Sequence, residues 1–235
     1  MSQSIEKWCK EQGVYVEEQS GFTANRRFQT RIVALIEDLR ITVAAPNRPA
    51  LCIFIDFLTA FDRMWYPVLM RTLKRIDMPL EIRKWIFNWL QNRYMFISYG
   101  DVSSENFKVS VGAPEGSVLA ALLFRLHIHF LISYFPQITC HLFADDLLMV
   151  INGALEKRLS VNVKYIQEQA NKVLKSLEKF SDDHILPVNI KKTKAMLIHS
   201  AVNAEKLNIY YKDVKIEYVI KFKYLGVELG TKLGL

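Results

Sequence analysis

The order of apolar segments along the chain predicts an α+β domain in which helices pack on one side of a mixed sheet. Three observations support this expectation. A continuous apolar run at 51–55 is typical of a buried central strand. The apolar stretch 138–151 is interrupted by a short polar turn, which indicates a hairpin. A long amphipathic pattern of helical period follows over 155–182, so its apolar stripe should cover the sheet.

The other elements follow from periodicity and from breakers such as glycine and proline. We expect the end of a helix and a short connection over 1–20, and helices over 23–43, 66–76, 80–92 and 118–134. We expect strands over 94–99, 106–111, 195–199, 207–211, 214–217 and 222–229. The aromatic residues Trp85, Phe87, Trp89 and Tyr94 are interpreted as core rather than as platforms for stacked bases.

Size and charge narrow the classes of function. The 235 residues, 51% of them hydrophobic, are enough for one domain or two small lobes. The net charge of +7 and the pI of about 9.2 favour an anionic partner, either nucleic acid or a membrane surface. Three widely spaced cysteines indicate neither a disulfide framework nor a zinc knuckle, and they fit a reduced, intracellular setting. Arg125, His127 and His129 interrupt the longest apolar run, which argues against a membrane span.

Two adjacent carboxylates, Asp145 and Asp146, lie within the apolar hairpin. Desolvation penalises each charge and their mutual repulsion adds to the cost, so a bound cation would stabilise the pair. Asp56 ends the run 51–55 and could share that cation if the two strands are neighbours. The alternative is a solvated turn in which the two aspartates have no role.

Other segments leave two interpretations open. Gly112-Ala113-Pro114-Glu115-Gly116-Ser117 leads into a helix and could bind an anion at the helix N-terminus or simply cap it. Asp62 could cap the helix that begins near Trp65. The five arginines between Arg26 and Arg48 could contact phosphates or form a solvated face. A zinc site from His127, His129, Cys140 and His141 is a further, weaker alternative.

Several short motifs occur in one order along the chain, and that order is specific. They are Gln19-Ser20-Gly21-Phe22, Asp56 with Ala60-Phe61-Asp62, Gly112 to Leu119, Phe143-Ala144-Asp145-Asp146, Asn189 with Lys192-Thr193-Lys194, and Phe222-Lys223-Tyr224-Leu225-Gly226. With this order and spacing, the chain resembles the reverse transcriptase domain of non-LTR (LINE-like) retrotransposons from about Glu18 to its C-terminus.

This resemblance implies a right-hand polymerase palm, a ferredoxin-like mixed sheet with helices on one face, together with partial fingers. Residues 1–50 would form the N-terminal segment and partial fingers, and residues 51–235 would form the palm. Asp56, Asp145 and Asp146 would hold two Mg²⁺ ions, or Mn²⁺, for transfer of a nucleotide from a dNTP to a primer 3′-hydroxyl.

The resemblance also implies roles for residues outside the acidic cluster. Phe61 would act as a steric gate against ribonucleotides, with the main chain at Phe57 beside the metal site. Gly112, Pro114, Glu115 and Gly116 would hold the templating base pair, and Arg26 is included among the substrate-binding residues. Lys192 would lie near the pyrophosphate as a proton donor. Tyr224, Leu225 and Gly226 would form the primer grip.

The sequence also departs from the family. Glu115 stands where the family usually has Gln, and it places a negative charge near the template. The segment before Gln19 is too short for the usual finger hairpin, and no thumb, endonuclease domain or cysteine-rich segment is recognised, so we expect a truncated polymerase.

The expected partners are an RNA template, a DNA primer, the RNA–DNA hybrid and dNTPs, with no membrane, and the family implies a nuclear location. Two alternatives are an inactive RNA-binding relic of such a polymerase and an interaction domain with an exposed apolar face.

Overall fold

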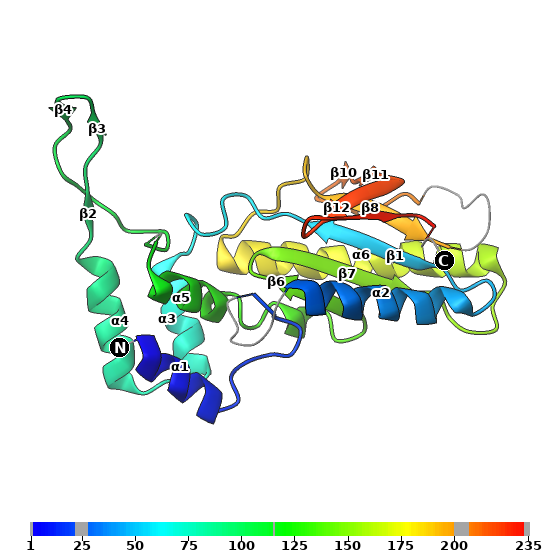
Figure 1. Cartoon of the computed structure of the whole chain (residues 1–235), viewed down its shortest axis with the longest axis horizontal. Coiled ribbons are helices and arrows are strands. Elements are labelled where there is room, and N and C mark those ends of the chain that lie inside the picture. Colours follow the sequence, from blue (N-terminus) through cyan, green and yellow to red (C-terminus); the bar gives the residue numbers. More distant parts are fainter. Residues whose placement is uncertain (1, 22–27, 115, 200–206, 233–235) are drawn as a thin grey trace. The chain divides into compact units, whose positions relative to one another are not determined.

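The computed structural model describes residues 2–21, 28–114, 116–199 and 207–232, and it forms two compact units (Figure 1). One, here called the helical unit, comprises Met1–Val16 and Thr59–Phe130. The other, here called the sheet unit, comprises Glu17–Leu58 and Leu131–Leu235. These units divide the chain at other points than the expected boundary after residue 50. The assignment of 1–50 to partial fingers and of 51–235 to a palm therefore stays a proposal.

A five-stranded mixed sheet is the centre of the sheet unit, with the strand order β11-β8-β1-β7-β6. Its strands are β1 (Ala50–Ile55), β6 (Thr139–Phe143), β7 (Asp146–Asn152), β8 (Lys194–Ile198) and β11 (Glu217–Tyr218). β1 pairs antiparallel with β7 and β8, and β6 pairs antiparallel with β7. β11 pairs parallel with β8. The expected hairpin and the expected central strand are both confirmed.

The remaining elements of the sheet unit are helices and short hairpins. They are α2 (Phe28–Ala44), the 3₁₀ turn η1 (Ile132–Tyr134), α6 (Leu159–His184), β9 (Tyr210–Tyr211), β10 (Val214–Lys215), β12 (Lys221–Tyr224) and β13 (Val227–Gly230). β9 pairs with β10, and β12 pairs with β13. The long amphipathic helix expected over 155–182 is thus present as α6.

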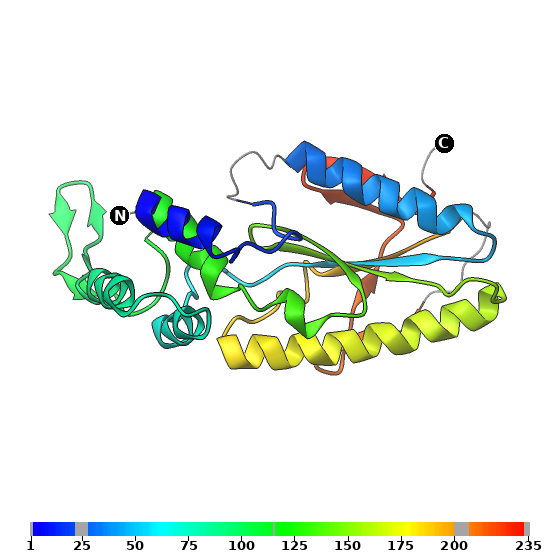
Figure 2. The same ribbon diagram turned by 90° about the horizontal axis from the view of Figure 1, so that it is seen from below.

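Helices cover both faces of the sheet, not one face as expected: α2 lies on one side and α6 on the other (Figure 2). All six residues of β1 are buried, and successive side chains of a strand point to opposite faces. Ala50, Cys52 and Phe54 share a core cluster with residues of α2 and of the β12–β13 hairpin. The intervening residues of β1 face the side that α6 covers. A central strand that is apolar on both faces requires a cover on both.

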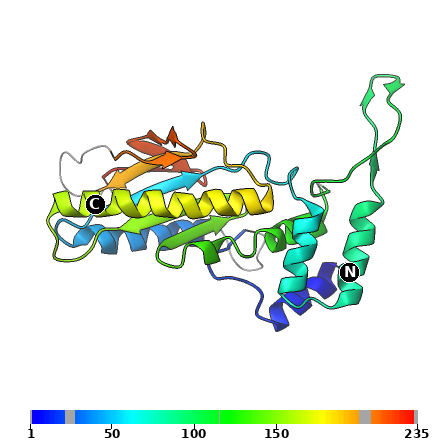
Figure 3. The same cartoon turned by 180° about the vertical axis from the view of Figure 1, so that it is seen from behind.

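The helical unit contains α1 (Ser2–Glu11), α3 (Tyr66–Arg75), α4 (Leu80–Gln91) and α5 (Val118–His127). A hairpin extends from the end of α4 (Figures 1 and 3) and contains β2 (Tyr94–Met95), β3 (Ser98–Tyr99), β4 (Val102–Ser103) and β5 (Phe107–Lys108). α3 begins at Tyr66 with Pro67 in its first turn and Trp65 as its N-cap, without a side-chain cap. Asp62 is therefore not the cap of this helix.

Three expectations in this unit need correction. The helix expected over 118–134 ends at His127, because the chain passes from one core to the other near Phe130. The strands expected over 94–99 and 106–111 form only short ladders. Phe87 and Tyr94 are 42% and 65% exposed, so they are not core residues. Within the described ranges, no helix combines the length and apolarity that a membrane crossing needs.

Candidate active site

The three aspartates singled out in the sequence lie at one end of the sheet. The register pairs Ile55 with Leu147, so the next residues along these strands, Asp56 and Asp146, occupy the same edge. Phe143 pairs with Asp146 across the β6–β7 hairpin, which leaves Ala144 and Asp145 as its tight turn. Ala144 has a φ of 57°, in the left-handed region that makes such a turn possible. The strand order therefore brings residues 56 and 146 together from 90 residues apart in the sequence.

The protein environment disfavours negative charge on both carboxylates of the turn. Burial raises the pKa of Asp145, and the charge of Asp56 adds to this effect. Burial raises the pKa of Asp146 to about 6, with further contributions from Asp145 and Asp56. Lys192 opposes both shifts. Acidic groups whose negative charges repel one another within a half-buried site are stabilised by a cation.

A loop before β8 is tied to the backbone of Asp56. Asn189 N–H donates to Asp56 O at 2.7 Å, and Asp56 N–H donates to Thr193 Oγ1 at 3.4 Å. Lys192 Nζ lies 3.8 Å from Asp56 Oδ1, and its side chain is 71% exposed. Phe57 forms an isolated bridge with Val188 on the other side of Asp56. The loop thus holds the ammonium group of Lys192 beside the acidic edge of the sheet.

A groove of about 440 Å³ opens over this edge of the sheet unit. Its lining includes residues from β1 and the residue after it, from β7, from the start of β8 and the loop before it, and from the β12–β13 hairpin: Phe54, Ile55, Asp56, Asp146, Leu147, Lys191, Lys192, Lys194, Phe222, Lys223, Tyr224 and Leu225. The ring of Phe222 stacks on that of Phe54, with centroids 4.1 Å apart. Lys194 is held by Glu217 Oε2 at 2.6 Å, whereas Lys191, Lys192 and Lys223 are exposed. A groove that combines carboxylates with cations suits a ligand that brings both metal ions and phosphates.

The structure therefore brings together Asp56, Asp146, Lys192, Tyr224 and Leu225, with Asp145 adjacent on the turn. Gly226 has a φ of 84° and completes the turn between β12 and β13, where a left-handed conformation favours glycine. Arg26 and Glu115, also expected at the site, lie outside the described residues.

The residues expected around the template belong to the helical unit and form a local arrangement of their own. Ala113 N–H donates to Phe61 O at 2.8 Å, and Gly112 N–H donates to Met64 O at 3.0 Å. The ring of Phe61 stacks on Phe124 of α5, with centroids 4.3 Å apart. Ser117 accepts from Leu119 N–H at 3.2 Å, so the loop after Pro114 and Gly116 does cap α5.

Gly112 is required by a close approach in the same loop. Its φ is +87°, and a Cβ there would lie 3.0 Å from Asp62 O. Tyr66 Oη and Arg93 Nη1 both donate to Gly112 O, at 3.0 and 2.9 Å. Phe61 is thus fixed by backbone bonds on one side and by a ring contact on the other.

The donor set is suited to Mg²⁺ or Mn²⁺. Carboxylate oxygens are the hard ligands that Mg²⁺ prefers, and a bound cation would offset the burial and the mutual repulsion that raise the pKa values of Asp145 and Asp146. Within the described residues, no three His, Cys, Asp or Glu side chains are grouped closely enough to form a complete metal site. The zinc alternative built from His127, His129, Cys140 and His141 therefore has no such group to support it among these residues. A metal at the acidic edge would complete its coordination with water and substrate oxygens.

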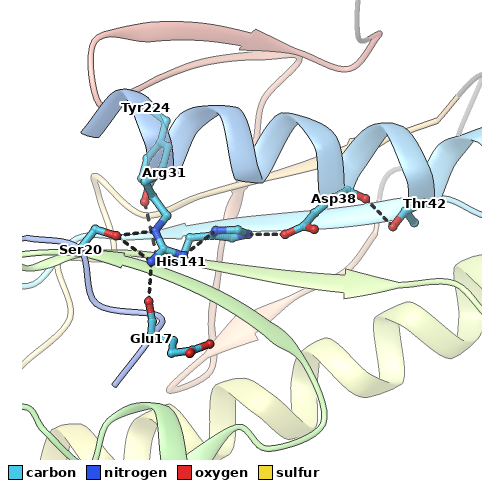
Figure 4. Close-up of polar contacts among 7 residues, drawn as sticks. All are labelled: Glu17, Ser20, Arg31, Asp38, Thr42, His141 and Tyr224. Atoms are coloured by element: carbon cyan, nitrogen blue, oxygen red, sulfur yellow. Dashed lines mark hydrogen bonds and ion pairs between the residues drawn. The ribbon is translucent and has the colours of Figure 1, made fainter. Parts of the chain in front are cut away.

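Gln19, Ser20 and Gly21 belong to the motif order noted in the sequence, which gave them no role. The structure places them against the β6–β7 turn, where Gln19 Nε2 donates to Ala144 O at 3.0 Å. A polar cluster formed by Arg31, Asp38 and His141 lies next to them and was not predicted from the sequence (Figure 4). The signal available was a buried histidine in an apolar strand, which needs partners.

Comparisons with known proteins identify the family of the chain. Residues 2–229 match the family described as "Reverse transcriptase (RNA-dependent DNA polymerase)". The chain is 24% identical over 226 residues to the "Probable RNA-directed DNA polymerase from transposon X-element" of Drosophila melanogaster, covering 94% of this chain and 24% of that protein. It is 22% identical over 187 residues to the "RNA-directed DNA polymerase from mobile element jockey" of the same species, covering 77% of this chain and 19% of that protein.

Solved structures show the same fold. A telomerase structure from Candida tropicalis, in complex with a fragment of telomeric RNA, matches with a TM-score of 0.62 at 10% identity, covering 98% of this chain and 36% of that one. A telomerase structure from Candida albicans, also with such a fragment, matches with a TM-score of 0.60 at 12% identity, covering 97% of this chain and 36% of that one.

The chain therefore belongs to the reverse transcriptase family, and the mixed α+β fold expected from its sequence is confirmed. Within that family it is a domain related to the reverse transcriptases of non-LTR retrotransposons such as X-element and jockey. The chain spans about a quarter of the length of the X-element protein and about a fifth of that of the jockey protein.

Proposed function

We propose that this chain contributes RNA-directed DNA synthesis, with Asp56, Asp145 and Asp146 as its catalytic carboxylates. The observation that carries the proposal is the groove that joins Asp56 and Asp146 to Lys191, Lys192 and Lys223 at the edge of the sheet. Membership of the reverse transcriptase family indicates the class of reaction. The groove provides the carboxylates and the ammonium groups that this reaction needs.

The three aspartates would hold two Mg²⁺ ions, or Mn²⁺, and the main chain at Phe57 lies beside Asp56. When bound, the metal would supply Lewis-acid activation of the primer 3′-hydroxyl and would stabilise charge on the triphosphate. The chain's own contribution would be to orient the carboxylates through the pairing of β1 with β7 and the tight β6–β7 turn, while the charge of Lys192 favours their ionised form.

Lys192 is suited to a role at the leaving group. Its ammonium lies 3.8 Å from Asp56 Oδ1 on an exposed side chain, so it can reach a phosphate bound at this edge. We assign it the donation of a proton to the departing pyrophosphate. Lys191 and Lys223 would neutralise backbone phosphates of the primer and the hybrid, beside the primer grip formed by Tyr224, Leu225 and Gly226.

The helical unit would supply selectivity for the substrate. Phe61 would exclude the 2′-hydroxyl of a ribonucleotide, and Gly112, Pro114, Glu115 and Gly116 would support the templating base pair. Arg26 would contact the triphosphate. The stacking of Phe61 on Phe124 supports this role, because a gate must keep one side-chain orientation.

The test is incorporation of labelled dTTP on poly(rA)/oligo(dT) with Mg²⁺, for the wild-type chain, Asp145→Asn and the control Asp101→Asn. Asp101 lies in the exposed hairpin of the helical unit. We expect incorporation by the wild type and the control, and a loss of roughly a thousandfold for Asp145→Asn, because several kcal/mol of charge stabilisation depend on this group. Equal incorporation by all three proteins would refute the site.

The net charge of +7 favours a second candidate function, a non-catalytic RNA-binding domain. It predicts salt-sensitive binding of poly(rA)/oligo(dT) by folded protein, with no incorporation by the wild type and no effect of Asp145→Asn on affinity. Incorporation by the wild type would exclude this candidate.

A further inference from the structure

The segment Glu17–Gly21, here called the strap, runs along the outer edge of β6 and reaches the turn that carries the two aspartates. Gln19 forms a parallel bridge with Leu142. Ser20 N–H donates to Leu142 O at 2.9 Å, and Leu142 N–H donates to Glu18 O at 3.0 Å. The strap thus extends the sheet by one irregular strand beyond β6.

The side chain of Gln19 binds the peptide groups of the turn itself. Its Nε2 donates to Ala144 O at 3.0 Å, and its Oε1 accepts from Ala144 N–H at 3.1 Å. The same Oε1 accepts from Gly21 N–H at 2.8 Å. Ala144 lies in the turn between the paired strands, so the amide of Gln19 replaces the ladder bonds that a strand residue would make. Gln19 is 3% exposed, which keeps water from competing for these bonds.

Gly21 lets the strap approach the turn closely. A Cβ at this position would lie 2.1 Å from Ala144 N and 2.8 Å from Ala144 Cα. Both are backbone atoms, which cannot move aside without changing the turn. Glycine is therefore required here by contact with the residue that precedes Asp145.

The strap is also anchored to α2 (Figure 4). Arg31 Nε and Nη2 donate to Ser20 Oγ at 2.9 and 2.7 Å, and Nη2 donates to Glu17 O at 2.6 Å. Arg31 Nη1 lies 3.5 Å from His141 Nδ1 on β6. The bonds from Gln19 to the turn therefore start from a segment that is itself held at two points.

From these contacts we propose that Gln19 is a positioning residue: its side-chain amide, aligned by the strap, fixes the conformation of Ala144 and so the orientation of Asp145 and Asp146. This inference rests on the proposed function, because it assigns the strap a purpose in metal binding. It gives a role to the Gln19-Ser20-Gly21 motif, which the proposed mechanism does not use.

The experiment compares the full wild-type chain with Gln19→Met, which keeps the side chain's length but removes its hydrogen bonds. Gln29→Met, at an exposed position of α2, is the matched control. Two quantities are measured: amide hydrogen exchange of Ala144 by NMR, and Mn²⁺ affinity by electron paramagnetic resonance. We expect at least tenfold faster exchange and about tenfold weaker Mn²⁺ binding for Gln19→Met, with thermal unfolding still cooperative. Gln29→Met should match the wild type.

A second variant covers the case in which Gln19→Met does not fold. Gln19→Glu keeps an acceptor for Ala144 N–H and Gly21 N–H and loses only the donor to Ala144 O. It should show an intermediate loss of Mn²⁺ affinity that is largest at pH values where the new carboxyl is ionised, since the ionised group then faces a carbonyl oxygen.

Two failures are distinguishable. If the wild-type chain binds Mn²⁺ and Asp145→Asn weakens this binding, but both Gln19 variants bind as tightly as the wild type, the positioning role is wrong and the proposed site stands. If Mn²⁺ binding by the wild type is indifferent to Asp145→Asn, the proposed metal site is wrong, and the positioning role is wrong with it.

Discussion

Asp145 and Asp146 illustrate, at the scale of single residues, how a site can be costly to the fold and useful for chemistry. Burial and the neighbouring charge of Asp56 raise the pKa of both carboxyl groups. A sequence selected for stability alone would place neutral residues on this turn. The chain keeps Asp145 and Asp146 there, with Asp56 at the end of the neighbouring strand, and sets Lys192 against them. This is the arrangement expected of a site completed by a ligand.

The gate residue gives a prediction about the choice of sugar. Phe61 is held by Phe124 and by the backbone bond from Ala113 N–H, so a smaller side chain would leave space where a 2′-hydroxyl could fit. In a chain that incorporates dNTPs, we expect Phe61→Ala to raise the relative efficiency of rNTP incorporation by at least tenfold. The measurement is the ratio of kcat/KM for dTTP and UTP on poly(rA)/oligo(dT). Phe96→Ala, in the exposed hairpin, should leave the ratio unchanged; an unchanged ratio in Phe61→Ala would remove the assignment of the gate.

His141 gives a prediction about pH and stability. Burial, and then the charge of Arg31, lower the pKa of His141 from 6.5 to about 4, although Asp38 Oδ2 lies 3.4 Å from its Nε2. The unfolded chain therefore binds a proton at a higher pH than the folded chain does. The stability contributed by the neutral ring is complete above pH 6.5 and is lost as the pH falls toward 4.

The contribution of His141 to the free energy of unfolding changes by on the order of 3 kcal/mol between pH 6.5 and pH 4, since each unit of pKa shift corresponds to about 1.4 kcal/mol. Urea unfolding at pH 7.5 and pH 4.5 measures most of this change. The wild type should lose more unfolding free energy than His141→Asn between these two values, by about 2 to 3 kcal/mol. The same loss in both proteins would show that the folded-state ring is protonated near its usual pKa.

Short-range sequence patterns predict most of the secondary-structure elements. The features that they do not predict depend on contacts between residues far apart in the sequence. The apolar run of β1, the hairpin around Asp145 and the amphipathic stripe of α6 are all read from local periodicity. The end of α5 at His127 could not be read, because the apolar run continues where the chain moves from one core to the other. The cover of both sheet faces depends on which strands pair, and no local pattern contains that information.

In the candidate site, too, some features follow from the sequence and others depend on contacts between distant parts of the chain. Asp56 and Asp146 could be matched to a family motif by sequence order, and the sheet register then places them at one edge. The bond from Gln19 to Ala144 joins residues 125 positions apart, and nothing near Gln19 in the sequence indicates its partner. For the same reason the contact of Arg31 with His141, 110 positions away, was missed.

The loop that contains Gly112 gives a prediction for one element. Gly112 and Gly100 both have positive φ values, +87° and +60°, but only at Gly112 would a Cβ meet backbone, with Asp62 O at 3.0 Å. Substitution by Ala should cost about 1 kcal/mol at Gly100 from conformational strain, and about 1 kcal/mol more at Gly112. Urea unfolding of the two variants measures the difference. Equal destabilisation would show that the loop has room to move.

Charge distribution is a property of the whole molecule, and it gives a prediction about nucleic acid. The net charge is +7, and Lys191, Lys192 and Lys223 line the groove. We expect replacement of these three lysines by Gln to weaken the salt dependence of binding to poly(rA)/oligo(dT). The slope of log K against log salt should become less steep by about 2, because each lost phosphate contact changes it by roughly 0.7 to 0.9.

A control variant carries Gln at Lys164, Lys172 and Lys175, which are exposed on α6, on the other face of the sheet from α2. It removes the same charge and should keep the wild-type slope. If both triple variants change the slope equally, net charge governs binding and the groove has no special part in it.

The central claim, that Asp56, Asp145 and Asp146 together bind a divalent cation, can be measured without the rest of a polymerase. The measurement is calorimetric titration of Mn²⁺ into the wild-type chain, Asp145→Asn and Asp101→Asn at pH 7.5. We expect a saturable site in the wild type and in Asp101→Asn, weakened at least tenfold in Asp145→Asn. Indistinguishable titrations of all three proteins would show that these aspartates do not form a cation site.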